Sequence, residues 1–276
     1  MKTIVLAAFA TCLTLSAVAQ DTTKRENADT IRIGGMIIIK DGDKNDTTRN
    51  SKVSFGNNRH RNKNANVQTN CWVVDLGFAN YHDETSYGAA QSSGFVSTDI
   101  NKDALKLRTG KSVNVNVWLF MQKLNIAKHV LHFKYGLGVE LNNYRFDNER
   151  VQFQEDPTKV VLNPDWKGFD KNKLAADYAT VPMMLNLNFT PKRERGFGIS
   201  AGVSAGYLYS ARQKTKESGN KEKVHDDFDL RKWKLSYIGE LNLGPVKLYG
   251  AYAVKSMFEE GLDQTPYNVG IRLSRF

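Results

Sequence analysis

The sequence lacks any apolar run of the roughly 18 residues that a membrane-spanning helix requires. It is also poor in cysteine, with Cys12 and Cys71 as the two cysteines among 276 residues. Cys12 lies in an apolar leader that we expect to be removed, so the mature chain keeps one cysteine and cannot close an internal disulfide. These shortages argue against a helical membrane protein and against a small disulfide scaffold.

The residues that usually carry catalysis or bind metals are scattered. The five histidines fall in separate segments without metal-ligand spacing, and they are His60, His82, His129, His132 and His225. We find no nucleophile elbow, no phosphate-binding loop and no paired carboxylates in a suitable frame. The sequence therefore predicts a protein that is not an enzyme, with no catalytic, cofactor-binding or metal-binding residues and no cofactor.

Positive charge is in excess, with 39 Lys and Arg against 29 Asp and Glu and a formal net charge of +10. The cations are dispersed along the chain, so nucleic acid is not an expected partner. Anionic lipid head groups suit a basic exported protein better.

The amino terminus predicts export. Residues 1–19 combine Lys2, an apolar stretch over Ile4–Leu15 and the small residues Ala17 and Ala19, which is the pattern of a secretory signal peptide. Residues 20–69 are polar and turn-rich, and we interpret them as a periplasmic segment. Within that segment, Thr30–Lys40 predicts a short β-hairpin around two glycines, and Ser51–Phe55 predicts a further short strand.

The stretch Phe197–Arg212 reads FGISAGVSAGYLYSAR. Its odd positions from 197 to 209 are apolar, whereas its even positions are mostly small or polar. A period of two indicates a β-strand with two different faces. The strand is longer than usual and has aromatic residues at both ends of its apolar face, which is typical of a strand that crosses a bilayer in a closed barrel.

The same alternation recurs from residue 70 to the end of the chain and predicts eight strands. They are Cys71–Tyr81, Lys111–Leu124, His129–Phe146, Leu174–Phe189, Phe197–Arg212, Asp229–Leu243, Val246–Met257 and Thr265–Phe276. The connections after the first, third, fifth and seventh strands are longer than the others, which is the asymmetry of outer-membrane barrels. We therefore predict an all-β fold, an eight-stranded antiparallel up-and-down transmembrane β-barrel over residues 70–276.

The alternation also predicts which side chains face lipid and which face the lumen. We interpret Trp72, Tyr207, Trp233 and Tyr252 as part of an interfacial aromatic belt. Pro182 cannot donate to a neighbouring strand, so we expect a bulge or a local break there. On the second strand we place Val113, Val115, Val117, Leu119 and Met121 outside, and Asn114, Asn116, Trp118, Phe120 and Gln122 inside.

Small or polar residues fill the predicted lumen. We place His132, Ser200, Ser204, Ser210 and Arg212 inside and interpret the histidine and the serines as filling residues. The charged side chains that we expect to form an ion-pair network in the lumen, near its periplasmic end, are Asp75, Lys134, Glu140, Glu240, Lys247 and Arg272. The charged stretch Gln213–Asp227 we interpret as a solvated outer loop.

The chain resembles the PorT-like family of outer-membrane β-barrel proteins, barrels of the OmpA/OmpX type. The resemblance lies in the Ala-Val-Ala-Gln end of the leader, the IRIGG…IIIKDGD segment, the strand that begins YATVPMML at Tyr178 and the GVSAGYL strand at Gly202. It implies an eight-stranded barrel in a Gram-negative outer membrane. Phe276 resembles a terminal assembly signal, although Val269, Ile271 and Leu273 lie on the opposite parity.

Three functions fit these observations. The first is a non-enzymatic integral outer-membrane barrel whose long outer loops serve adhesion, ligand contact or assembly with partners. Its partners are then outer-membrane lipids, the barrel-assembly machinery and outer-membrane or secretion proteins. The second is a small lipid-modifying or hydrolytic barrel enzyme, which needs a His–Ser–acid set at one rim. The third is a soluble lipocalin-like barrel that binds an apolar ligand inside.

Overall fold

The computed structural model describes residues 29–33, 36–40, 53–54, 65–155, 157–191, 196–217, 220–244 and 246–274. The chain divides into two units, residues 1–62 and residues 63–276. The predicted signal peptide and Phe276 lie outside the described residues. Among the described residues, no helix has both the length and the apolar character needed to cross a membrane.

The first unit contains a small antiparallel sheet. Strand β1 (Asp29–Ile33) pairs with β2 (Met36–Lys40) so that Ile33 lies opposite Met36. Strand β3 (Val53–Ser54) pairs with the other edge of β2. The β1–β2 pair occupies the stretch for which the sequence predicts a hairpin.

The second unit is a closed ring of eight antiparallel strands. They are β4 (Val67–Asp83), β5 (Val113–Ala127), β6 (Leu131–Arg145), β9 (Lys171–Asn188), β10 (Phe197–Glu217), β12 (Trp233–Leu243), β13 (Val246–Ala253) and β14 (Gln264–Leu273). Each strand pairs with the next along the chain, and β14 pairs with β4 to close the ring. This arrangement confirms the predicted eight-stranded up-and-down barrel.

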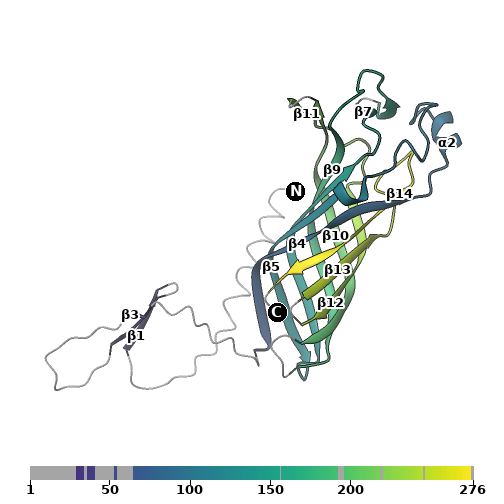
Figure 1. Ribbon diagram of the computed structural model, residues 1–276. Coiled ribbons are helices and arrows are strands. Elements are labelled where there is room, and N and C mark those ends of the chain that lie inside the picture. The colour runs from purple at the N-terminus through teal and green to yellow at the C-terminus, as the bar shows by residue number, and fades with distance from the viewer. Residues whose placement is uncertain are drawn as a thin grey trace, which may run out of the picture. The chain divides into compact units, whose positions relative to one another are not determined.

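The longer connections carry additional structure at one end of the barrel (Figure 1). The first contains α2 (Tyr87–Ser92) and the 3-10 turn η1 (Thr109–Lys111). The second contains a hairpin of β7 (Val151–Gln154) and β8 (Lys159–Leu162). In the third, β10 runs on to Glu217 and pairs with β11 (Asn220–Val224). The charged stretch Gln213–Asp227 is thus largely a hairpin that extends the barrel wall and not a loop, although β11 is exposed to solvent as expected.

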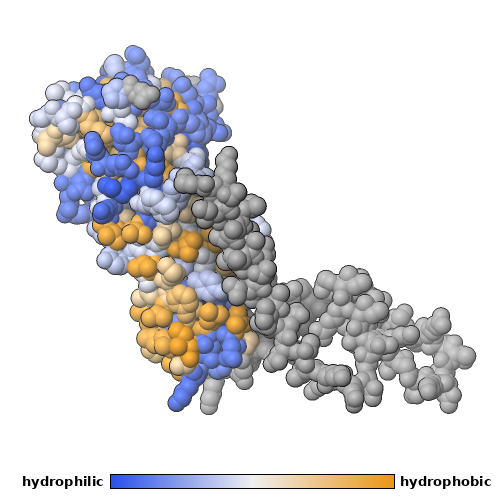
Figure 2. Space-filling model, turned by 180° about the vertical axis from the view of Figure 1, so that it is seen from behind, coloured by the Kyte–Doolittle hydropathy of each residue, from blue (hydrophilic) through white to orange (hydrophobic). Residues whose placement is uncertain are grey.

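The outer wall of the barrel is apolar. Most of the alternate residues that we placed outside are exposed or partly exposed, and Trp72 is 70% exposed. Figure 2 shows these apolar residues as an orange band on the barrel wall, below a mainly hydrophilic end formed by the longer connections. Trp72, Tyr207, Trp233 and Tyr252 all face outward, and the rings of Tyr207 and Trp233 meet edge to face at 5.1 Å.

Two bulges break the alternation and correct our placement of nearby side chains, and a further register shift lies between Asn125 and Ala127 at the end of β5. Leu119 is an extra residue of β5 relative to β6, because Trp118 pairs with Gly138 but Phe120 pairs with Leu137. Leu119 and Phe120 therefore both point out of the lumen, and Met121 points inward with 0% exposure. Our outward placement of Met121 and our inward placements of Phe120 and Gln122 were wrong. Gln122 lies beside the outward Tyr135, whose hydroxyl donates to it.

The second bulge lies in β10. Leu208 pairs with Tyr178 but Ser210 pairs with Asp177, so Tyr209 is the extra residue. Beyond it Ala211, Gln213 and Thr215 are buried. Ser210 and Arg212 consequently point outward, and our placement of both in the lumen was wrong.

Pro182 produces a break without a bulge. The pairing of β9 with β6 stops between Tyr135–Met183 and Gly138–Thr180 and resumes in the same register. Pro182 has no N–H to donate across this gap. The predicted local break is present, and Pro182 itself is buried.

Candidate functional site

We call the half of the lumen away from the longer connections the lower lumen and the half next to them the upper lumen. The lower lumen contains a network of buried charges. Asp75 and Arg272 are direct cross-strand partners where β4 meets β14. Arg272 donates two hydrogen bonds of 2.7 Å to the two carboxylate oxygens of Asp75. Trp118 and Asn116 also donate to Asp75, at 2.7 Å and 3.2 Å. With 0% exposure, the carboxylate is fully satisfied by donors rather than by water.

Glu240 extends this network across the lumen. Its carboxylate accepts a 2.7 Å hydrogen bond from Arg272 and a 2.6 Å hydrogen bond from Lys134. Lys134 reaches from β6 on the opposite wall and is 1% exposed. Arg272 and Glu240 thereby link four strands through a chain of alternating charges.

Lys247 lies opposite Asn242 in the β12–β13 pair, as predicted. Its ammonium donates to the backbone carbonyl of Ser274 at 3.0 Å and to the Ser274 hydroxyl at 2.6 Å. The six charged residues that the sequence placed in the lumen are all buried. The short contacts of Glu240 are with Lys134 and Arg272, whereas strand register alone predicts Lys247 as its partner across the β12–β13 turn.

A second ionic cluster lies further along the lumen. Glu140 of β6 forms an ion pair with Lys234 of β12 and accepts hydrogen bonds from Asn142 and Asn268 at 3.1 Å and 3.0 Å. The Lys234 ammonium lies 4.5 Å from the ring centroid of Tyr178. We did not predict Lys234 among the charges of the lumen. The alternation could have placed it there, because its neighbours Trp233 and Leu235 both point outward.

The upper lumen is closed by an apolar cap. Each of the four longer connections contributes phenylalanine to one aromatic cluster, which comprises Phe95, Phe146, Phe153, Phe228 and Phe258. The rings of Phe153 and Phe258 stack at 6.1 Å with an angle of 4° between their planes. We did not predict this cluster from the sequence. The available signal was the presence of phenylalanines in connections that are otherwise mostly polar. The cap makes the outer connections one packed body.

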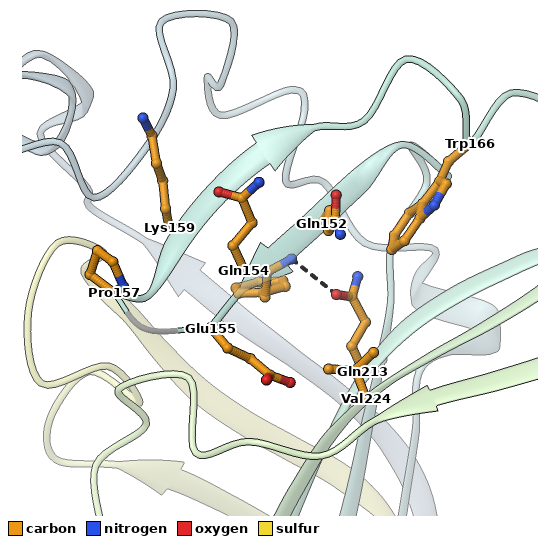
Figure 3. A pocket seen from close by; sticks show the side chains of 9 residues that line it. Gln152, Gln154, Glu155, Pro157, Lys159, Trp166, Gln213 and Val224 are labelled. Atoms are coloured by element: carbon orange, nitrogen blue, oxygen red, sulfur yellow. Dashed lines mark hydrogen bonds between the residues drawn. The ribbon is translucent and has the colours of Figure 1, made fainter.

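A cleft opens on this cap between the β7–β8 hairpin and the β10–β11 hairpin. Its volume is about 500 Å³, and we call it the outer cleft; its lining is Gln152, Phe153, Gln154, Glu155, Pro157, Lys159, Trp166, Gln213 and Val224. Figure 3 shows Trp166 at one end of the outer cleft and Pro157 and Lys159 at the other.

The floor of the outer cleft is rigidly held. The side chain of Gln213 accepts a 3.0 Å hydrogen bond from the backbone N–H of Phe153 and donates 2.8 Å and 2.9 Å hydrogen bonds to Val151 and Asn172. Trp166 is fixed by stacking on Phe169 at 5.3 Å. An indole face next to amide and charged side chains suits a ligand with both apolar and hydroxyl or amide groups.

The described residues contain no group of three His, Cys, Asp or Glu side chains placed to hold a metal ion. The residues considered for hydrolysis are also separate. Ser200 accepts hydrogen bonds from Asn186 at 3.0 Å and Lys134 at 3.5 Å, which are cationic or amide donors rather than a general base. His132 is buried, and its ring lies 6.4 Å from that of His129.

A family model for the outer membrane protein beta-barrel domain matches residues 50–259. This match spans more than half of the chain, so the chain belongs to that family. The protein is therefore an integral β-barrel of the outer membrane, in agreement with its closed ring of strands and apolar outer wall. No curated protein matches the chain.

Proposed function

We propose that this protein is a non-enzymatic, sealed outer-membrane barrel whose packed cap contacts a ligand or partner through the outer cleft. The observation that carries the proposal is the aromatic cluster to which all four long connections contribute. Loops that only join strands need no common apolar core, whereas a recognition surface benefits from being held in one conformation before binding. Adhesion and partner assembly are the roles such a surface serves.

Several features support related parts of this proposal. The ionic interior does not suit the apolar ligand of a lipocalin-like barrel, because Asp75 and Lys134 lie where that ligand would sit. The leader over residues 1–19 and Phe276 support passage through the periplasm and delivery to the barrel-assembly machinery. The PorT-like resemblance supports outer-membrane or secretion proteins as partners and a Gram-negative source.

A glycan and peptide array probed with detergent-solubilised protein tests the outer cleft. We expect binding that Trp166→Ala weakens at least about tenfold, in the range of a lost stacking contact in a pocket. Trp166→Phe keeps an aromatic face and serves as the control. If wild type and Trp166→Ala bind every probe equally, the outer cleft is not the recognition site.

The alternative of a lipid-modifying or hydrolytic barrel enzyme is tested separately with phospholipid vesicles. We expect no release of fatty acid, because the Ser200 hydroxyl is held by Asn186 and Lys134. Sustained release that Ser200→Ala abolishes would replace our proposal with the enzyme.

A further inference from the structure

The outer face of the barrel wall carries a row of four cations directly opposite one another on adjacent strands. Arg145 of β6 pairs with Lys173 of β9, Lys173 pairs with Lys214 of β10, and Lys214 pairs with Lys223 of β11. Like charges on directly opposite residues destabilise a sheet. The opposed charges of this row therefore do not stabilise the sheet, and a binding role would explain them.

A second row runs beside the first. Lys171 of β9 pairs with Lys216 of β10, and Lys216 pairs with Lys221 of β11. We call the seven side chains of these two rows the cation rows. They face outward, because the residues that alternate with them, such as Asn172, Leu174, Gln213 and Thr215, are buried.

Acidic side chains neutralise only part of this charge. Asp177 forms an ion pair with Arg212, which lies next to the cation rows, and Asp170 lies 3.4 Å from Lys216. Lys173 donates to the side-chain oxygen of Asn143, and Arg145 donates to the backbone carbonyl of Asp170. Among the described residues, two carboxylates thus serve eight cations.

The ends of β9 and β10 that carry the cation rows lie beyond the apolar band. There, burial and then the charges of Lys171, Lys214 and Arg212 lower the pKa of Lys173 to about 8. Burial and then the charge of Arg212 also lower the pKa of Lys214. An anion placed among these ammonium groups would relieve the repulsion that adds to the effect of burial in both shifts.

The distance of the cation rows from the apolar band indicates which kind of anion they can reach. Tyr207 of the aromatic belt and the exposed Tyr209 end the apolar face of β10, and Lys214 follows five residues after Tyr209. Given the strand rise and tilt in barrels, Lys214 lies roughly 10 Å or slightly more above the belt. Phospholipid phosphates lie close to the edge of the hydrocarbon, whereas a phosphate carried on a sugar head group stands higher.

We propose that the cation rows bind the phosphates of a phosphorylated glycolipid in the outer leaflet, whose acyl chains lie against the apolar wall below. Cationic side chains are the usual ligands of phosphate, and Lys and Arg reach toward a membrane surface while their stems remain on the wall. The proposal is independent of the outer cleft, and it places the longer connections on the outer side of the membrane.

The test measures binding of lipid A, a diphosphorylated disaccharide lipid, to the full-length protein in detergent by native mass spectrometry. Lys214→Gln/Lys223→Gln removes two opposed cations of the first row. We expect this variant to bind lipid A about thirtyfold more weakly, since each of the two cations near an anionic lipid surface contributes on the order of 1 kcal/mol. The control Lys106→Gln/Lys167→Gln removes the same charge from exposed loop positions and should bind like wild type.

Three outcomes would overturn the proposal. Equal binding of lipid A by wild type and Lys214→Gln/Lys223→Gln excludes the cation rows. Equal binding of dephosphorylated lipid A excludes phosphate recognition. Equal occupancy by phosphatidylglycerol or by inorganic phosphate, lost in the same variant, assigns the site to a phospholipid or to free phosphate instead.

Thermal melting without lipid tests whether the cation rows stabilise the fold itself. Because Lys214→Gln/Lys223→Gln relieves repulsion, it should melt at the same temperature as wild type or higher. A lower melting temperature would show that the cation rows stabilise the fold, and the premise of the proposal would then be wrong.

Discussion

Glu240 accepts charge-assisted hydrogen bonds from two cations, Lys134 and Arg272, in a part of the lumen that water does not reach. A buried ion pair contributes little net stability, but the loss of one member leaves the others uncompensated. The same residue type occurs on the exposed β11 as Glu222, where water screens the charge. The two positions therefore offer a matched comparison.

We expect Glu240→Ala to lower the free energy of unfolding by about 3–5 kcal/mol, because the buried cations Lys134 and Arg272 both lose this carboxylate. Glu222→Ala should change it by less than about 0.5 kcal/mol, as is usual for an exposed site. Denaturant-induced unfolding of both variants in lipid vesicles measures the difference. Equal midpoints would mean that water reaches the network and solvates the cations.

At the scale of the strands, β5 and β6 approach each other closely at Gly138. A Cβ atom at this position would lie 2.5 Å from the backbone oxygen of Val117 and 2.7 Å from Trp118. Gly239 on β12 has its nearest such neighbour at 3.9 Å. The first glycine is required by the contact between two strands, whereas the second leaves room for a side chain.

Gly138→Ala should therefore destabilise the barrel by about 1–3 kcal/mol, the usual cost of overpacking. Gly239→Ala should be tolerated without such a loss. Melting of the two variants in detergent compares them directly. A Gly239→Ala variant that melts as low as Gly138→Ala would show that the loss comes from the substitution itself and not from the contact with Val117.

The bulge at Leu119 makes a second prediction about β5. In a Cys71→Ser background, a cysteine at Phe120 should react with a lipid-phase probe, and a cysteine at Met121 should not, because the extra residue turns Met121 into the lumen. Cys71 must be replaced first because it is free and exposed. Labelling at Met121→Cys but not at Phe120→Cys would restore the simple alternation and remove the bulge.

These elements also show how far the sequence could predict the structure. Alternation of apolar and polar residues located all eight barrel strands and the face of most side chains, because one face of each strand meets lipid. It could not locate the bulges at Leu119 and Tyr209, since an extra residue is set by pairing with a neighbouring strand and has no local pattern of its own.

The site was less predictable than the fold. Asp75 and Arg272 could be placed at similar depth from the closure of the ring, and they are direct partners. The partners of Glu240 depend on which walls face each other across the lumen, which no pattern along the chain records. Likewise, the phenylalanines of the cap come from four separate connections and meet only in three dimensions.

For the molecule as a whole, the lumen is blocked twice. The ionic network fills its lower part and the aromatic cluster of the cap closes its upper part. An eight-stranded barrel has an interior just wide enough for side chains. The packing of the described lumen residues therefore favours our proposal of a sealed barrel.

We accordingly expect the protein reconstituted in planar bilayers to show no steady conductance of porin size. A general porin added to the same bilayers verifies that channels of that size are detected. A stable open channel from the purified wild type would show that the lumen is wet and that the network around Glu240 is not a plug.

The pairing of β14 with β4 also constrains how the chain reaches its final state. Asp75 and Arg272 are 197 positions apart in sequence, so their ion pair forms only when both ends of the chain are present and in register. Contacts of such long range are slow to form because the loop between them must first be ordered. Closure of the ring brings this pair together, and a chain that stops short of Arg272 would leave the Asp75 carboxylate at an unpaired strand edge without this partner.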